Sequence, residues 1–154
     1  MLQSLNQNLD PMSQSTHPKV ILFVCVHNAG RSQMAQAFTN HLANQYGLNI
    51  LGDSAGTVGG KSLNPIAVEV MNELGISMEG QEPKLITQDL VDASDKIFSM
   101  GCGVDVEACP AKFLLTEDWQ LEDPAGQPIE KVREIRDQIK FKVDNLLHSY
   151  QSPI

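Results

Sequence analysis

The most informative part of the sequence is Lys19-Val-Ile-Leu-Phe-Val-Cys25-Val-His-Asn-Ala-Gly-Arg31-Ser32-Gln-Met34, an apolar run followed by a small polar loop. Its first half, residues 19–25, is typical of a central parallel strand that is buried on both faces. Apolar residues recur at helical spacing from Ser32 onward, which predicts a helix directly after the loop. We therefore expect a strand, a tight loop and a helix start, with a cysteine opening the loop and an arginine closing it.

This loop has the features of an anion-binding site. The backbone N–H groups of a loop that enters a helix point inward, and the helix dipole adds positive potential there. The Arg31 guanidinium can hold two oxygens of a tetrahedral anion. The same potential favours the thiolate of Cys25, which is its nucleophilic form, and Ser32 can donate a hydrogen bond to the sulfur. The N–H groups would come from the loop residues Val26, His27, Asn28, Ala29 and Gly30.

Composition limits the partners of the protein. The length of 154 residues suggests one domain, and the formal net charge of −8 argues against nucleic acid or an acidic membrane as partner. An anionic substrate remains compatible, because its site would be local. The sequence has no long apolar run and no signal pattern at its N-terminus, so we expect a cytoplasmic protein. Residues 1–18 are expected to form a flexible extension, and residues 19–150 a single folded domain.

Alternating strand and helix signals predict an α/β protein with a four-stranded parallel sheet in a three-layer, doubly wound fold. The expected strands cover 19–25, 48–54, 96–100 and 113–115, and the expected helices cover 32–46, 64–74, 88–93 and 128–147. The glycine-rich segment 55–62 resembles a nucleotide-binding loop, but Asn64 and Pro65 start the next helix too late for that function. Ligands of such folds bind beyond the carboxyl ends of the strands, where the loops of Cys25 and Cys102 both lie.

The chain has three cysteines, and an odd number without a signal peptide argues against a structural disulfide framework. Cys102 lies between Gly101 and Gly103, so its backbone is free to bend, and Cys109 follows seven positions later. The two thiols are either unremarkable loop residues or members of a relay that passes oxidation between thiol pairs. Their spacing does not match a metal site, and we expect no metal.

A reaction that removes hydroxide or alkoxide from an oxyanion also needs a proton donor. Asp118, Glu122 and Asp123 all compete for that function, and spacing alone does not choose between them.

The motif Cys25-(five residues)-Arg31-Ser32 resembles the anion loop of the low-molecular-weight protein tyrosine phosphatases and of the arsenate reductases built on that fold. Several further segments resemble the reductases more closely than the phosphatases, and together they cover nearly all of residues 19–147. They are Arg31-Ser32-Gln33-Met34-Ala35, Ser54-Ala55-Gly56, Asn64-Pro65, Cys102 with Cys109 at their separation, and Asp123-Pro124-Ala125-Gly126.

The resemblance implies a thioredoxin-coupled arsenate reductase that is a monomer without a bound cofactor. In this mechanism Cys25 attacks bound arsenate, Arg31 and the loop amides stabilise the charge, and Asp123 protonates the departing hydroxide. Cys102 then attacks the Cys25 sulfur and arsenite leaves. Cys109 attacks Cys102 in turn, and thioredoxin reduces the exposed Cys102–Cys109 disulfide. The alternatives are a mycothiol- or glutaredoxin-coupled reductase and a low-molecular-weight protein tyrosine phosphatase.

The sequence departs from the family pattern in two places. Thioredoxin-linked members that bind potassium near the loop use acidic side chains, where this chain has Gln36 and Lys84. We expect the Lys84 ammonium to replace the cation and to support the loop by reaching Asn28 and Ser54. The tripeptide at 101–103 resembles relatives that use a small thiol, which leaves the electron donor open between thioredoxin and such a thiol.

Overall fold

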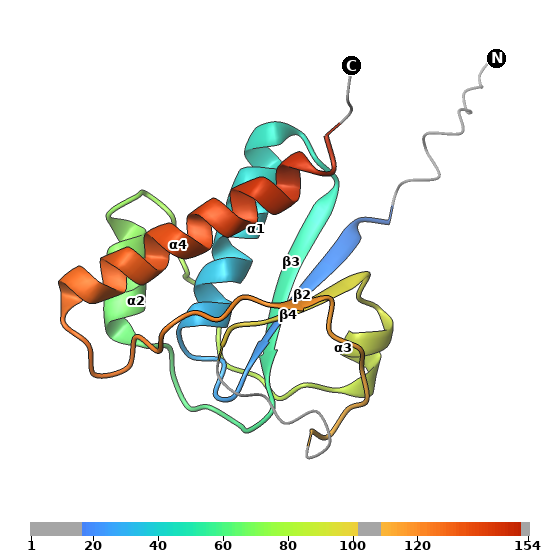
Figure 1. Ribbon diagram of the computed structural model, residues 1–154, viewed down its shortest axis with the longest axis horizontal. Coiled ribbons are helices and arrows are strands. Elements are labelled where there is room, and N and C mark those ends of the chain that lie inside the picture. The colour runs from blue at the N-terminus through green and yellow to red at the C-terminus, as the bar shows by residue number, and fades with distance from the viewer. Residues whose placement is uncertain (1–16, 102–108, 152–154) are drawn as a thin grey trace.

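The computed structural model describes residues 17–101 and 109–151, and in that part of the chain a parallel sheet has the strand order β3-β2-β4-β5 (Figure 1). The strands are β2 (Lys19–Cys25), β3 (Ile50–Gly56), β4 (Lys96–Ser99) and β5 (Glu117–Asp118). β2 pairs with β3 along its whole length and with β4 on its other side. The predicted four-stranded parallel sheet is confirmed, and β2 carries Cys25 to the carboxyl end of a central strand.

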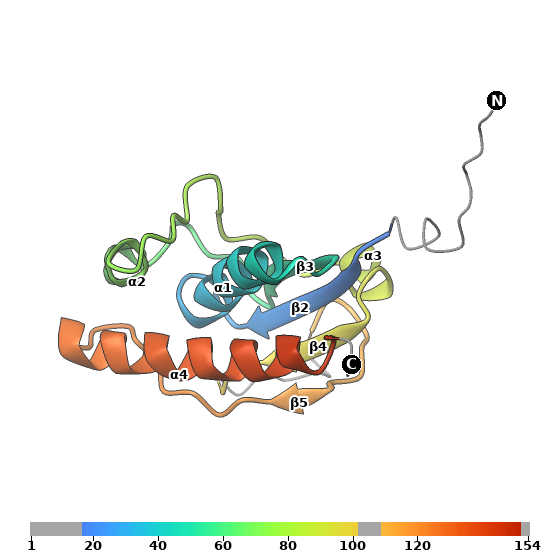
Figure 2. The same cartoon turned by 90° about the horizontal axis from the view of Figure 1, so that it is seen from above.

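Helices cover both faces of this sheet. They are α1 (Arg31–Tyr46), α2 (Pro65–Asn72), α3 (Gln88–Asp92) and α4 (Ile129–His148). Helices α1 and α4 lie side by side on one face (Figure 2), and α3 lies on the other (Figure 1). In the described residues, no helix is both long and apolar enough to cross a membrane.

The side chains of β2 alternate between the two faces and so build two cores. Ile21 and Phe23 pack with the apolar sides of α1, α2 and α4, whereas Leu22 and Val24 pack with residues such as Val91 of α3. All four of these β2 side chains are fully buried. Burial on both faces is why the strand is apolar throughout, and it confirms the three-layer α/β fold.

Local sequence signals set the end of α1 and the start of α2 as expected. Gly47 ends α1 in a left-handed conformation with a φ of 69°. Asn64 caps α2 by accepting hydrogen bonds from the backbone N–H groups of Ile66 and Ala67, and Pro65 is its first residue. The glycine-rich segment 55–62 therefore does not lead directly into a helix, as a nucleotide-binding loop would.

Two expectations about the elements are wrong. The strand predicted at 113–115 is absent from that described segment, and β5 forms at Glu117–Asp118 instead. Leu114 is 91% exposed, and pairing with β4 begins only where the Thr116 N–H donates to the Ile97 carbonyl over 2.7 Å. The helix predicted at 64–74 is shorter than expected, because α2 ends at Asn72, and Leu74 is exposed in the turn that follows.

Candidate active site

The sulfur of Cys25 lies inside the loop that connects β2 to α1. The backbone N–H of Asn28 donates to it over 3.2 Å, and the hydroxyl oxygen of Ser32 lies 2.9 Å away. Asn28 is fully buried and has a φ of 57°, a left-handed conformation in which the chain folds back over the sulfur. Hydrogen bonds donated to a sulfur favour its charged form, so this loop favours the thiolate.

A cavity of about 500 Å³ opens at this loop. All residues of 25–31 line it, together with Asn64, Gly101 and residues 121–125. Gly30 allows the close approach of its two walls, because a Cβ at this position would lie 3.1 Å from the Pro124 side chain. The cavity lies at the N-terminus of α1, where backbone N–H groups and the helix dipole favour an anion. The predicted anion-binding residues therefore all contact one cavity.

Arg31 is buried at the wall of the cavity, and one end of its guanidinium is already fixed. Its Nη1 donates to the carbonyls of Met100, over 3.1 Å, and Leu121, over 2.8 Å. Its Nη2 lies 3.8 Å from the Asp123 carboxylate at the cavity. The arginine therefore joins the end of β4 to the segment 121–125, and it lines the cavity together with Asp123.

The three candidate acids have different partners. Asp118 accepts from the Ser99 hydroxyl over 2.5 Å and from the Gly101 N–H over 2.8 Å, so it has a structural role at the end of β4. Glu122 forms an ion pair of 2.7 Å with Lys131, and this hydrogen bond raises the pKa of the Lys131 ammonium. Asp123 lines the cavity next to Arg31, and its side chain is 65% exposed. Of the three acids, Asp123 is the one that both lines the cavity and lies next to Arg31.

Cys102 lies outside the described residues, but Gly101 directly before it lines the same cavity as Cys25. Gly101 has a φ of 84°, and a Cβ there would lie 2.4 Å from the Leu121 backbone nitrogen. Only glycine fits this conformation and this contact without strain. The left-handed conformation of Gly101 thus lets its backbone pack directly against the backbone of Leu121 at the wall of the cavity.

Cys109 is a free thiol with a different environment. It is 9% exposed and belongs to the apolar core between the sheet and α3, together with Leu22 and Val91. The following segment is tied to α3 because the Gln88 side chain accepts from the Lys112 N–H over 2.9 Å and donates to the Lys112 carbonyl over 3.0 Å. In this conformation Cys109 is protected from solvent.

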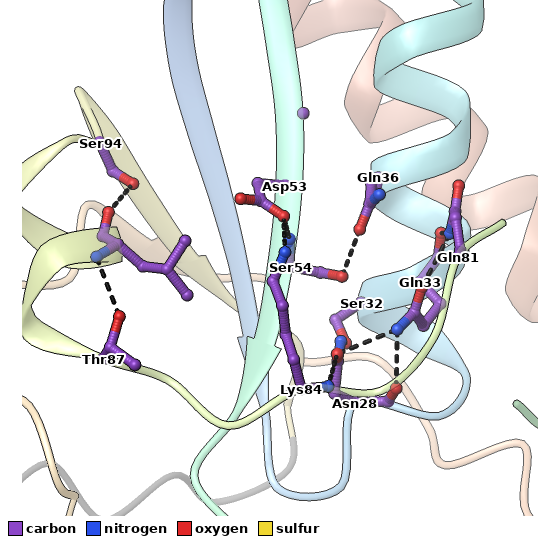
Figure 3. Close-up of polar contacts among 12 residues, drawn as sticks. Asn28, Ser32, Gln33, Gln36, Asp53, Ser54, Gln81, Lys84, Thr87 and Ser94 are labelled. Carbon is purple, nitrogen blue, oxygen red and sulfur yellow. Dashed lines mark hydrogen bonds and ion pairs between the residues drawn. The ribbon is translucent and has the colours of Figure 1, made fainter. Parts of the chain in front are cut away.

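The expected contacts of the Lys84 ammonium are wrong. The ammonium pairs with the Asp53 carboxylate over 2.5 Å, while the Lys84 backbone N–H donates to the Asn28 side-chain oxygen over 3.0 Å (Figure 3). Ser54 donates to Gln36 over 2.5 Å instead. The reason is electrostatic, because an ammonium pairs more strongly with a neighbouring carboxylate than with an amide or a hydroxyl.

Two glutamines next to the loop were missed. Gln33 is fully buried and donates to both the backbone carbonyl and the side-chain oxygen of Asn28, and Gln81 donates to Gln33 (Figure 3). The position of Gln33 directly after Ser32 was a signal for a role near the loop. Nothing in the sequence singled out Gln81, which is 48 positions away from Gln33. Metal ligands are not gathered anywhere in the described segments, where no group of three His, Cys, Asp or Glu side chains could hold an ion.

Comparison with known proteins gives one family. Residues 20–152 match the model of the low molecular weight phosphotyrosine protein phosphatase family. A protein of Synechocystis sp. named glutaredoxin arsenate reductase is 36% identical over 130 residues, which cover 84% of this chain and 96% of that protein.

Two solved structures extend the comparison. One is an arsenate reductase in the phosphate-binding state, with 36% identity and a TM-score of 0.72, and the match covers 86% of this chain and 99% of the other. The other is a thioredoxin-dependent arsenate reductase of Corynebacterium glutamicum, with 37% identity and a TM-score of 0.69, and the match covers 88% of this chain and 63% of the other. By sequence and by structure, the chain belongs to the low molecular weight phosphotyrosine protein phosphatase family.

Proposed function

We propose that this protein is an arsenate reductase in which Cys25 is the nucleophile, Arg31 and the loop amides hold the anion, and Asp123 is the acid. Cys102 and Cys109 complete a thiol relay. The observation that carries the proposal is the single cavity lined by Cys25, Arg31, Asp123 and Gly101, the residue next to Cys102. The names of the Synechocystis and Corynebacterium relatives support the same activity.

The reduction of arsenate to arsenite needs only these groups and an external reductant that supplies two electrons. The Cys25 thiolate forms a bond to arsenic, and one arsenate oxygen leaves as water with a proton from Asp123. The Cys102 thiolate then attacks the Cys25 sulfur, so that a disulfide forms and the electron pair of the S–As bond reduces As(V) to As(III). Cys109 attacks Cys102 and releases the Cys25 thiolate, and a dithiol reductant restores Cys102 and Cys109.

We propose thioredoxin as that reductant, because its two thiols can open an internal disulfide between Cys102 and Cys109 by two successive exchanges and leave no mixed disulfide behind. A glutaredoxin or a small thiol such as mycothiol is the alternative, and the name of the Synechocystis relative favours a glutaredoxin. The relay needs a reducing compartment, which supports the cytoplasm as its location. A monomer suffices, since all groups in the scheme come from one chain.

The test is NADPH consumption that depends on arsenate, in the presence of thioredoxin and its reductase. A parallel reaction with glutaredoxin, its thiol and the matching reductase identifies the donor. We expect turnover with the thioredoxin system. If turnover occurs only with the glutaredoxin system, glutaredoxin is the electron donor and thioredoxin is not. If neither system supports arsenate-dependent turnover, the proposed function is refuted.

A phosphatase is the second candidate, because the cavity and Cys25 suit a phosphate ester equally well. In that case Cys25 would form a phosphocysteine that water hydrolyses, and Cys102 would have no function. Cys102→Ser separates the two activities. A reductase loses turnover with arsenate in this variant, whereas a phosphatase keeps hydrolysis of p-nitrophenyl phosphate at the rate of the unmodified protein.

A further inference from the structure

A chain of side-chain hydrogen bonds runs from the partly buried Gln81 through three buried residues to the sulfur of Cys25. Figure 3 shows its links from Gln81 to Ser32. Gln81 contacts Gln33 over 2.8 Å, Gln33 contacts the Asn28 side chain over 2.9 Å, and Asn28 contacts Ser32 over 2.8 Å. Ser32 in turn lies 2.9 Å from the Cys25 sulfur. Of the residues in this chain, Cys25 and Asn28 line the cavity that would hold the anion, whereas Ser32, Gln33 and Gln81 do not.

The direction of this chain follows from the backbone groups that contact it. The Lys84 backbone N–H can only donate, so the Asn28 atom that it contacts must be the oxygen, and the Asn28 NH₂ must face Ser32. The Asn28 carbonyl can only accept, so Gln33 must turn its NH₂ toward Asn28 and its oxygen toward Gln81.

The two ends of the chain fit the same direction. The Gln81 NH₂ also contacts the Gln33 backbone carbonyl, an obligate acceptor, over 3.1 Å. Because the Ser32 oxygen accepts from Asn28, its single proton is available for the Cys25 sulfur. Every link therefore donates toward Cys25, and hydrogen bonds aligned in this way polarise one another.

We propose that Gln81 is a positioning residue for the nucleophile: its NH₂ donates to the Gln33 oxygen, holds the Gln33 amide in place and polarises the chain, so that the Ser32 hydroxyl donates more strongly to the Cys25 thiolate. Without the Gln81 NH₂, the Gln33 oxygen loses its donor, and the hydrogen bonds from Gln33 to Asn28 and from Asn28 to Ser32 are less polarised. The Lys84 backbone N–H still fixes the direction of the Asn28 amide, so the chain keeps its direction, but the Ser32 hydroxyl stabilises the thiolate less. The inference rests on Cys25 as the nucleophile of the proposed function.

The test measures how fast iodoacetamide alkylates Cys25 as a function of pH, with the modified cysteine identified by mass spectrometry. Gln81→Met keeps the length of the side chain and its neutral charge but removes the donor. We expect an alkylation rate about threefold lower at pH values below the midpoint, with the limiting rate at high pH unchanged. Gln33→Met, one link closer to the sulfur, should give a larger fall in the same direction. Gln138→Met, the same change at an exposed site on α4, should give none.

The results separate the inference from the function on which it rests. An alkylation profile of Gln81→Met that matches the unmodified protein would overturn the inference, even if arsenate is reduced. A loss at all pH values, including the limiting rate, would also overturn it, because that pattern means general damage to the loop. The proposed function fails separately, when the unmodified protein does not reduce arsenate.

Discussion

The sites of Cys25 and Cys109 show how one kind of residue acquires two environments. The Cys25 sulfur lies in a loop at a helix N-terminus, where a backbone N–H and the Ser32 hydroxyl surround it and a cavity adjoins it. The Cys109 thiol lies between apolar side chains, and hydrogen bonds between Gln88 and Lys112 tie the segment that follows it to α3. Polar donors and an adjoining cavity therefore leave the first sulfur accessible to a ligand, whereas apolar packing screens the second from solvent.

The largest effects are expected from removing the thiols themselves. Cys25→Ser should lower arsenate reduction by at least about 10⁴-fold, because the serine hydroxyl is not ionised at neutral pH and cannot take over the attack. Cys109→Ser should still release about one arsenite per protein and then stop. Rapid-quench samples in which arsenite is counted per protein distinguish the two variants. If both variants release the same amount of arsenite in a single turnover, Cys25 and Cys109 do not have the different roles expected here.

Arg31→Lys tests whether the anion site depends on the fork geometry of the guanidinium. A lysine ammonium cannot hold the carbonyls of Met100 and Leu121 and an anion at the same time, so we expect kcat/KM for arsenate to fall about 10²–10³-fold. Steady-state kinetics over a range of arsenate concentrations provide the measurement. A fall of less than about threefold would mean that the loop amides alone bind the anion.

Asp123→Asn should lower kcat about 10²-fold, because the departing oxygen loses its proton donor. Glu122→Gln is the matched control: its carboxylate pairs with Lys131, and we expect a change of less than about twofold. Both variants are compared by arsenate turnover at neutral pH. The reverse order of effects would move the acid from position 123 to position 122.

Gln88→Ala should weaken the protection of Cys109. Loss of the two hydrogen bonds to Lys112 should destabilise the packing of the segment after Cys109 against α3 by about 1–2 kcal/mol. Because the segment then opens more often, the alkylation rate of Cys109 should rise roughly tenfold. The rate for Cys25 should stay the same. Peptide mass spectrometry after timed alkylation reports both thiols in one sample, and an unchanged rate for Cys109 would show that its burial does not depend on Gln88.

Much of the fold and of the loop was predictable because the signals are local. The apolar run 19–25, the cap at Asn64 and the stop at Gly47 each act within a few residues of their position. The contact between Cys25 and Ser32 also follows from a short segment, since a tight loop that enters a helix leaves few conformations for it.

The parts that sequence did not predict depend on distant partners. The Lys84 ammonium pairs with Asp53, which is 31 positions away, and Gln81 donates a hydrogen bond to Gln33, which is 48 positions away. Asp118, Glu122 and Asp123 look alike in sequence, and only their contacts with Ser99, Lys131 and Arg31 separate them. The strand at Glu117–Asp118 was missed because its charged residues carry no strand signal and its pairing with β4 sets its position.

The most direct test of the central claim is to map the disulfides after one turnover with arsenate, by acid quench, alkylation and peptide mass spectrometry. We expect a Cys102–Cys109 disulfide in the unmodified protein and a Cys25–Cys102 disulfide in Cys109→Ser, each formed in step with arsenite. Arsenite released while all three cysteines remain alkylatable, or a disulfide that never includes Cys25 in the Cys109→Ser variant, would contradict it.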